Sequence, residues 1–252
     1  MNKKSVANDK GNNMTVLPRW FYNELQQSGV DFEDTAQVEA YDRNQRSSTE
    51  QAEQALIKWL GISAGHTVID LGAGTGTFAI QACKAGAYVH AVDVSPTMLA
   101  YAQKKAHAAN AKSIEFHHAG FLTYEQQGNP VDFIVTKAAF HHLPDFWKMV
   151  GLLRMASMLK VGGILYLRDT VFSFNASEYR SRIEAWIDRV AKPAGEGFTV
   201  SDFETHVREE YTTFGWIIEG MLIRAGFEIE QADYLAPEYA QYVCRKSKSK
   251  TK

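Results

Sequence analysis

The sequence lacks any apolar run close to the roughly 20 residues that a membrane-spanning helix needs, and it has only two cysteines. Cys83 lies in an apolar helical pattern and Cys244 in a late strand pattern, without the spacing of metal ligands. Residues 1–14 are polar and lack the apolar stretch of a secretory signal, so we expect a disordered leader there. These absences predict a cytoplasmic protein that does not bind membranes.

A strong charge of one sign is also absent, but the net charge of −2 is unevenly distributed. Basic residues gather in 1–11 and 245–252, and the body between them carries a net charge of about −9. An acidic body repels phosphate backbones, so we expect no nucleic-acid partner. Residues 247–252 are interpreted as a short, solvated basic tail.

The chain has no internal repeat and no low-complexity linker, so we predict a single domain over 15–246, with 15–48 as an N-terminal cap segment. From residue 47, short β-branched runs alternate with helical patterns, which indicates a parallel sheet covered on both faces. The expected helices are 49–60, 76–86, 96–108, 145–159 and 216–226, and the expected strands are 66–71, 87–93, 113–118, 131–136, 164–169, 227–235 and 240–246.

Residues 170–215 interrupt this alternation with two helical segments and a glycine-containing loop. An insertion at this point should sit beside the carboxyl ends of the strands, where open α/β sheets bind ligands. We therefore expect a substrate lid. Its aromatic residues suit either a partly apolar pocket roof or ordinary helix packing.

The sharpest motif is VIDLGAGTGTF at 68–78. Its three glycines allow a tight turn between a strand and a helix and a close approach of the backbone to a ligand. Asp70, which ends the strand, can order this loop or reach a cationic amino group. Asp93 ends the next strand, where a carboxylate can accept hydrogen bonds from both ribose hydroxyls.

The residue after the third glycine distinguishes two families of proteins that bind nucleotide-type ligands. A dinucleotide fingerprint GxGxxG requires glycine where Thr77 stands, and the sequence instead reads GxGxG followed by Phe78. This form resembles motif I of class I S-adenosylmethionine-dependent methyltransferases. The resemblance implies a Rossmann-like, doubly wound, mostly parallel seven-stranded sheet with a helical insertion after strand five.

The resemblance continues through HAVDVSPTMLAYAQ at 90–103, DFIVTKAAFHHLPD at 132–145 and LKVGGILYLRD at 159–169, as in small-molecule members related to the ubiquinone-biosynthesis and type 11 enzymes. In HHAGFLTY at 117–124, Gly120-Phe121 stands where many members have an acid that meets the adenine amino group. The resemblance implies S-adenosyl-L-methionine as the cofactor. The implied cofactor-binding residues are Tyr41, Asp70, Gly72, Ala73, Gly74, Gly76, Asp93, Val94, Met98, Gly120, Phe121 and Lys137.

Two of these roles have alternatives. Lys137 either contacts the cofactor through its backbone or pairs with an acidic group of the substrate, and Tyr41 either meets the cofactor's carboxylate end or lies on a solvated helix face. The candidate catalytic residues are His141, His142 and Asp169 on the loops above strands four and five. Each also has a structural interpretation, as a packing histidine or as an ion-pair partner of a neighbouring arginine.

The motifs that are missing narrow the chemistry further. Thr136 and Lys137 stand where enzymes that methylate amide or nucleobase nitrogens carry an Asn/Asp-Pro-Pro-Tyr motif, and no acidic triad of the magnesium-dependent catechol type is recognisable. We therefore predict metal-free transfer to a small-molecule acceptor. The alternatives are a nicotinamide-dependent oxidoreductase, disfavoured by Thr77 and by the lack of a Tyr-x-x-x-Lys pattern, and a non-catalytic S-adenosylmethionine-binding protein.

Overall fold

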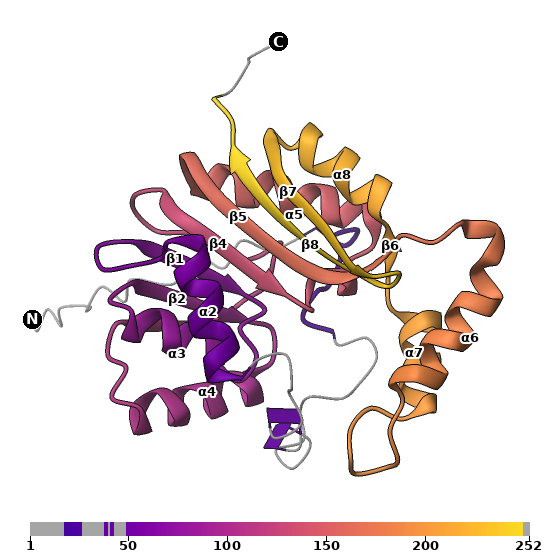
Figure 1. Ribbon diagram of the computed structural model, residues 1–252. Helices are drawn as coiled ribbons and strands as arrows, with labels where there is room; N and C mark the ends of the chain where they lie inside the picture. Colours follow the sequence, from indigo (N-terminus) through magenta and orange to yellow (C-terminus); the bar gives the residue numbers. More distant parts are fainter. Residues whose placement is uncertain (1–17, 27–37, 40, 43–48, 249–252) are drawn as a thin grey trace, which may run out of the picture.

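The computed structural model describes residues 18–26, 38–39, 41–42 and 49–248 (Figure 1). The expected leader, much of the N-terminal cap segment and residues 249–252 of the basic tail lie outside the described residues. In the described part of the chain, no helix is both long enough and apolar enough to cross a membrane. Cys83 and Cys244 are free thiols.

An open sheet forms the centre of the molecule, with the strand order β3-β2-β1-β4-β5-β8-β7 (Figure 1). The strands from β3 to β5 run parallel, and β8 runs antiparallel to both of its neighbours. This is the Rossmann-like, doubly wound, mostly parallel sheet that the sequence predicts. The strands are β1 Thr67–Leu71, β2 Tyr88–Asp93, β3 Ile114–His118, β4 Val131–Lys137, β5 Leu159–Phe172, β6 Thr213–Phe214, β7 Phe227–Ala236 and β8 Tyr239–Lys246.

Helices cover both faces of the sheet, and each face buries its own apolar cluster. Helices α2, α3 and α4 lie against one face, whereas α5 and α8 pack on the other (Figure 1). The α-helices are α2 Glu50–Leu60, α3 Thr77–Lys84, α4 Pro96–Ala108, α5 Asp145–Met158, α6 Tyr179–Val190, α7 Val200–Glu209 and α8 Gly215–Arg224, and the short 3-10 helices are η1 Phe140–His142 and η2 Ala176–Glu178.

A side-chain cap at Ser95 determines where helix α4 begins. The Ser95 hydroxyl accepts a hydrogen bond from the Met98 N–H at 3.1 Å, and Pro96 occupies the first turn, where its missing N–H costs nothing. This cap sets the direction in which the chain leaves β2. It therefore fixes Asp93 and the residues after it beside the glycine loop.

The sheet has one more strand than the seven expected, and its fifth strand is longer than the predicted 164–169. Strand β5 is extended at its carboxyl end because it pairs with β8 as far as Thr170 and then with the two-residue β6 through Val171 and Phe172. The short β6 brings the end of the insertion back to the sheet before α8 begins.

The insertion forms two helices, α6 and α7, which Figure 1 shows to one side of the sheet beyond β6. Trp186 of α6 is buried, and its indole N–H donates to the Tyr239 hydroxyl at 3.0 Å. Arg189 adds an ion pair of 2.5 Å to the buried carboxylate of Glu238. For Trp186, the packing interpretation of the insertion's aromatic residues is therefore the correct one.

Candidate functional site

The glycine loop joins β1 to α3 in a conformation that side chains would obstruct. Gly72 has a φ of 75°, and a Cβ there would lie 2.4 Å from the Cβ of Ala139. Gly74 also has a positive φ of 52°, but its surroundings are open. The first glycine thus permits close packing against the loop after β4, and the second keeps the side facing the cavity clear.

Asp93 ties this loop to the start of α4. One carboxylate oxygen accepts a hydrogen bond from the Gly74 N–H at 2.8 Å, and the other accepts from the Ser95 N–H at 2.9 Å. Burial raises the pKa of Asp93 above its usual value, and these backbone hydrogen bonds oppose that rise. The carboxylate is thus held in place by the backbone while it lines the cavity described next.

A cavity of about 130 Å³ lies at the carboxyl ends of β1, β2 and β4. Ten of the predicted site residues line it: Tyr41, Gly72, Gly74, Asp93, Val94, Met98, Gly120, Phe121, Lys137 and His142. Five predicted residues do not line it: Asp70, Ala73, Gly76, His141 and Asp169. The cavity is also lined by eight residues that the sequence analysis did not predict: Tyr22, Glu24, Gln26, Ser95, Ala119, Ala138, Ala139 and Leu143.

Glu24 is the missed residue with the strongest contacts. The Leu122 N–H donates to both of its carboxylate oxygens at 3.0 Å, and the Thr123 hydroxyl donates to one of them at 2.7 Å. A Cβ at Gly120 would lie 2.4 Å from this carboxylate, so the glycine makes room for it. Because Glu24 and Leu122 are 98 residues apart, no local pattern in the sequence signals the contact.

Asp70 and Lys137 lie close to the glycine loop and interact with one another electrostatically. Burial raises the pKa of Asp70 to about 7, against the lowering influence of the Lys137 cation. The Lys137 ammonium forms an ion pair with the buried carboxylate of Glu53 from α2. Asp70 also keeps one buried oxygen, Oδ2, without a hydrogen-bond partner among the described residues.

His141 is held between two carboxylates and does not line the cavity. Its Nδ1 pairs with Asp169, and its Nε2 lies 3.2 Å from the Oε2 of Glu210, which follows α7. Burial alone would lower the pKa of His141, but Asp169 and Glu210 together raise it to about 10. The ring is therefore an imidazolium at neutral pH, and both of its nitrogens are engaged.

His142, the next residue, lines the cavity instead. Burial, aided by the neighbouring His141 cation, lowers the pKa of His142 to about 4. Its imidazole is therefore neutral at pH 7 and able to accept a proton. The Tyr22 hydroxyl donates to the backbone carbonyl of His142 at 3.3 Å, which ties the N-terminal segment to this loop.

Comparison with known proteins identifies the family. A methyltransferase-domain family matches residues 68–163. An uncharacterised methyltransferase of Bacillus thuringiensis is 30% identical over 167 residues, which cover 66% of this chain and 71% of the relative. Another, of Geobacillus thermodenitrificans, is 27% identical over 195 residues, 77% of this chain and 84% of the relative.

Among solved structures, the fold is similar to that of magnesium protoporphyrin IX methyltransferase of Synechocystis with bound SAH. The TM-score is 0.59 at 20% identity, over 89% of this chain and 91% of that one. The chain belongs to the S-adenosylmethionine-dependent methyltransferases of class I, and its cofactor is S-adenosylmethionine. Family membership sets aside the oxidoreductase alternative.

Proposed function

We propose that this methyltransferase transfers a methyl group, without a catalytic metal, to a small molecule that binds beside His142. The observation that carries the proposal is the convergence of Asp93 and His142 on one cavity from the ends of different strands. A carboxylate suited to ribose hydroxyls and a neutral imidazole suited to proton removal are thus available to adjacent ligands.

The arrangement of the loop supports a cofactor site at the glycine-loop end of the cavity. Gly72 and Gly74 supply backbone that a ligand can approach closely, and Asp93 accepts hydrogen bonds from the ribose. Val94 and Met98 line the same cavity, and we assign them to the borders of the adenine. We assign three further predicted residues to shaping the loop rather than to touching the ligand: Asp70, Ala73 and Gly76.

The adenine end of the site is assigned to the turn after β3. Gly120 and Phe121 line the cavity there, and the Leu122 N–H is a backbone donor suited to an adenine ring nitrogen. Since that N–H donates to Glu24 in the structure, cofactor binding would have to displace the carboxylate. Contact of Tyr41 and Lys137 with the cofactor remains a proposal, supported by their place in the cavity wall.

Proton removal is assigned to His142. Bound S-adenosylmethionine supplies an activated methyl group on a sulfonium, so the protein has to position the acceptor atom and take its proton. The low pKa of His142 keeps the imidazole neutral at pH 7, so that it can accept a proton, although it also makes the ring a weaker base than an ordinary histidine. We assign His141 and Asp169 a positioning role: their ion pair fixes the loop that carries His142.

The hydrogen bonds that the nearby acidic side chains already accept support methyl transfer without a catalytic metal. The carboxylates of Glu24 and Asp93 accept hydrogen bonds from backbone N–H groups, so neither presents both oxygens to a cation in the cavity. The acidic body of the chain supports a small acceptor over a nucleic acid. The free thiols of Cys83 and Cys244 support the cytoplasm as the compartment.

The insertion at 170–215 is proposed to select the acceptor. None of the residues lining the cavity comes from it, but it packs against two of them, Tyr22 and Tyr41, and against His141, which precedes the cavity-lining His142. The Tyr211 ring lies 6.5 Å from that of Tyr22, the Phe198 ring lies 6.3 Å from that of Tyr41, and Glu210 pairs with His141. These contacts support the proposal that the insertion closes over a substrate.

The test is an assay for S-adenosylhomocysteine formation across pooled metabolites, combined with calorimetry of S-adenosylhomocysteine binding. Asp93→Asn should weaken binding by about 10- to 100-fold, because one charge-assisted acceptor is lost. Asp132→Asn is the matched control, because Asp132 also accepts a backbone N–H, that of Thr67, but at the opposite end of the sheet. Unchanged affinity in Asp93→Asn would refute the ribose assignment, and turnover with only macromolecular acceptors would refute the small-molecule proposal.

A further inference from the structure

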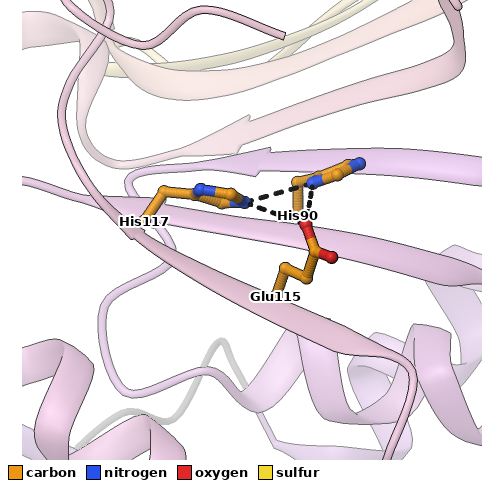
Figure 2. Close-up of side chains that lie close together, drawn as sticks. All are labelled: His90, Glu115 and His117. Atoms are coloured by element: carbon orange, nitrogen blue, oxygen red, sulfur yellow. Dashed lines mark hydrogen bonds and ion pairs between the residues drawn. The ribbon is translucent and has the colours of Figure 1, made fainter. Parts of the chain in front are cut away.

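Three side chains with metal-binding atoms meet on the outer strands of the sheet, away from the cavity. His90 of β2 lies opposite Glu115 of β3 in the register, and His117 follows two residues later, on the same face of β3. Figure 2 shows the two imidazole rings and the carboxylate pointing toward one another. Two strands that pair along their length hold these three groups in place.

The positions of three atoms match the size of a small cation. His90 Nδ1 lies 3.1 Å from His117 Nε2 and 3.4 Å from Glu115 Oε2, and the remaining side of the triangle is 3.7 Å. A point equidistant from these corners is about 2.0 Å from each, and Zn²⁺ bonds to histidine nitrogen and carboxylate oxygen are about 2.0–2.2 Å. A cation raised about 0.7 Å above their plane would have bonds of about 2.1 Å and angles of about 95–124°, which average near the tetrahedral value.

The same distances constrain where the ring hydrogens sit. Only one hydrogen fits between ring nitrogens 3.1 Å apart, so at least one of the two nitrogens presents a lone pair to the centre of the cluster. The carboxylate oxygen beside them presents lone pairs as well. A divalent cation at the centre would accept lone pairs from all three groups at once.

Neighbouring side chains orient the three groups, as outer partners do in metal sites. The Tyr88 hydroxyl donates to Glu115 Oε1, which leaves Oε2 turned toward the histidines. The Tyr124 ring packs against His117 at 5.1 Å between centroids. The other His90 nitrogen, Nε2, lies 3.5 Å from the amide nitrogen of Gln126.

A route for a cation from solvent is present. The three residues line a hollow with Tyr88, Tyr124 and Lys160 at its walls, and half of the Glu115 side chain, 52%, is exposed. Lys160 would repel a cation, but its ammonium is paired with Asp132 at 2.6 Å. The hollow is distinct from the catalytic cleft, since His90 precedes Asp93 by three residues, about 10 Å along the strand.

We propose that His90, Glu115 and His117 bind a divalent transition-metal cation of the zinc type, with a fourth, water-filled position toward solvent. Two imidazoles and one carboxylate are ligands that suit Zn²⁺, and Ni²⁺ and Cu²⁺ accept the same set. The cation ties the edge strand β3 to β2 and stabilises this side of the sheet. It takes no part in methyl transfer.

A second group, His141, His206 and Glu210, is the natural comparison. There, His141 is already paired with Asp169 on its other nitrogen, and Glu210 is paired with both histidines. Because His141 has a carboxylate partner at each of its two ring nitrogens, it needs no metal ion, and we assign that group to the attachment of the insertion. His206→Ala therefore serves as a control for the location of the metal.

The test uses the full chain, stripped of metal by a chelator and titrated with Zn²⁺ by calorimetry and thermal unfolding. We expect one Zn²⁺ per chain and a rise in Tm of about 5–10 °C at 100 times the Kd. His117→Ala and Glu115→Gln should each weaken binding at least about 10-fold, as expected when a ligand is lost. His107→Ala, on the exposed face of α4, and His206→Ala should bind like the wild type.

Three results would overturn the proposal. The first two are wild-type protein that binds no Zn²⁺ and unchanged affinity in both His117→Ala and Glu115→Gln. Since the two residues are at least partly exposed, their replacement should leave the fold intact, and S-adenosylhomocysteine binding by the variants checks this independently of the metal. A loss of Zn²⁺ binding in His206→Ala alone would place the cation in the second group and would also contradict the proposal.

Discussion

Two adjacent histidines show how strongly a residue's neighbours determine its chemistry. His141 lies between the carboxylates of Asp169 and Glu210 and is an imidazolium, while His142 lies in the cavity wall beside that cation and is neutral. The sequence presents both as equal candidates for a general base. The structure distinguishes them by what each ring faces.

The first residue-scale prediction concerns the pH dependence of turnover. If the neutral imidazole of His142 removes a proton, kcat should be level near neutral pH and fall as the pH decreases through about 4, its pKa. His142→Ala should lower kcat by about 10²- to 10⁴-fold and abolish this acid limb. Steady-state rates between about pH 3 and pH 8, which extend one unit below this pKa, check it. A variant with wild-type kcat would show that no base is needed at this position.

The second residue-scale prediction concerns the stability of the folded protein at alkaline pH. The pKa of His141 is raised in the folded state to about 10 from an ordinary value of 6.5, so its stabilising contribution is complete below about 6.5 and is lost as the pH rises through about 10. His141→Gln should remove that pH dependence and cost about 3–5 kcal/mol at pH 7, because buried carboxylates lose their partner.

Urea unfolding at pH 6, 8 and 10 measures both quantities. His107→Gln is the matched control, because His107 is exposed on α4. A wild-type free energy of unfolding that does not decline toward pH 10 would contradict the assignment of the charge to His141.

At the scale of elements, the alternating helices and strands were predictable because each has a strong local signal. The cap at Ser95 and the apolar runs of the parallel strands are examples. The two-residue β6 and the long β5 were not, since neither has a pattern of its own. They form because β8 and the end of the insertion offer backbone partners to residues beyond Asp169.

Two glycines of similar conformation allow a matched prediction about the turn after β1. Gly72 and Gly61 have φ values of 75° and 76°, but only a Cβ at Gly72 meets a neighbour, the Cβ of Ala139 at 2.4 Å. Gly61→Ala should cost about 1–2 kcal/mol for the backbone alone. Gly72→Ala should cost a further 1–3 kcal/mol or so for overpacking. Equal losses in urea unfolding would show that the loop yields without strain.

At the scale of the whole molecule, the cavity brings together residues that sequence motifs identify and residues that no local sequence pattern predicts. Asp93 ends a recognisable strand in a recognisable motif, and it lines the cavity. Glu24 and Tyr22 reach the same cavity from the N-terminal segment, and Glu210 reaches His141 from the insertion. Such contacts depend on how the chain folds back on itself, which local periodicity does not encode.

The size of the cavity predicts a movement of the N-terminal segment. Its volume of about 130 Å³ is below the roughly 300–1,000 Å³ of typical ligand pockets, so binding S-adenosylmethionine requires part of the wall to move. The segment 18–26 is the best candidate. Its Glu24 carboxylate accepts from the Leu122 N–H that we assign to adenine, and its Trp20 is 74% exposed. Hydrogen exchange of 18–26 should therefore accelerate when S-adenosylhomocysteine binds.

Glu24→Ala should tighten the binding of S-adenosylhomocysteine by about 10-fold, because the ligand no longer has to displace a charged hydrogen-bond acceptor. Glu125→Ala, which removes an exposed carboxylate from the same loop, should leave the affinity unchanged. Calorimetry of the two variants beside the wild type shows whether Glu24 is displaced by the ligand or binds it. If its removal weakens binding instead, then the carboxylate is a ligand of the cofactor, and the segment closes over the bound molecule rather than giving way to it.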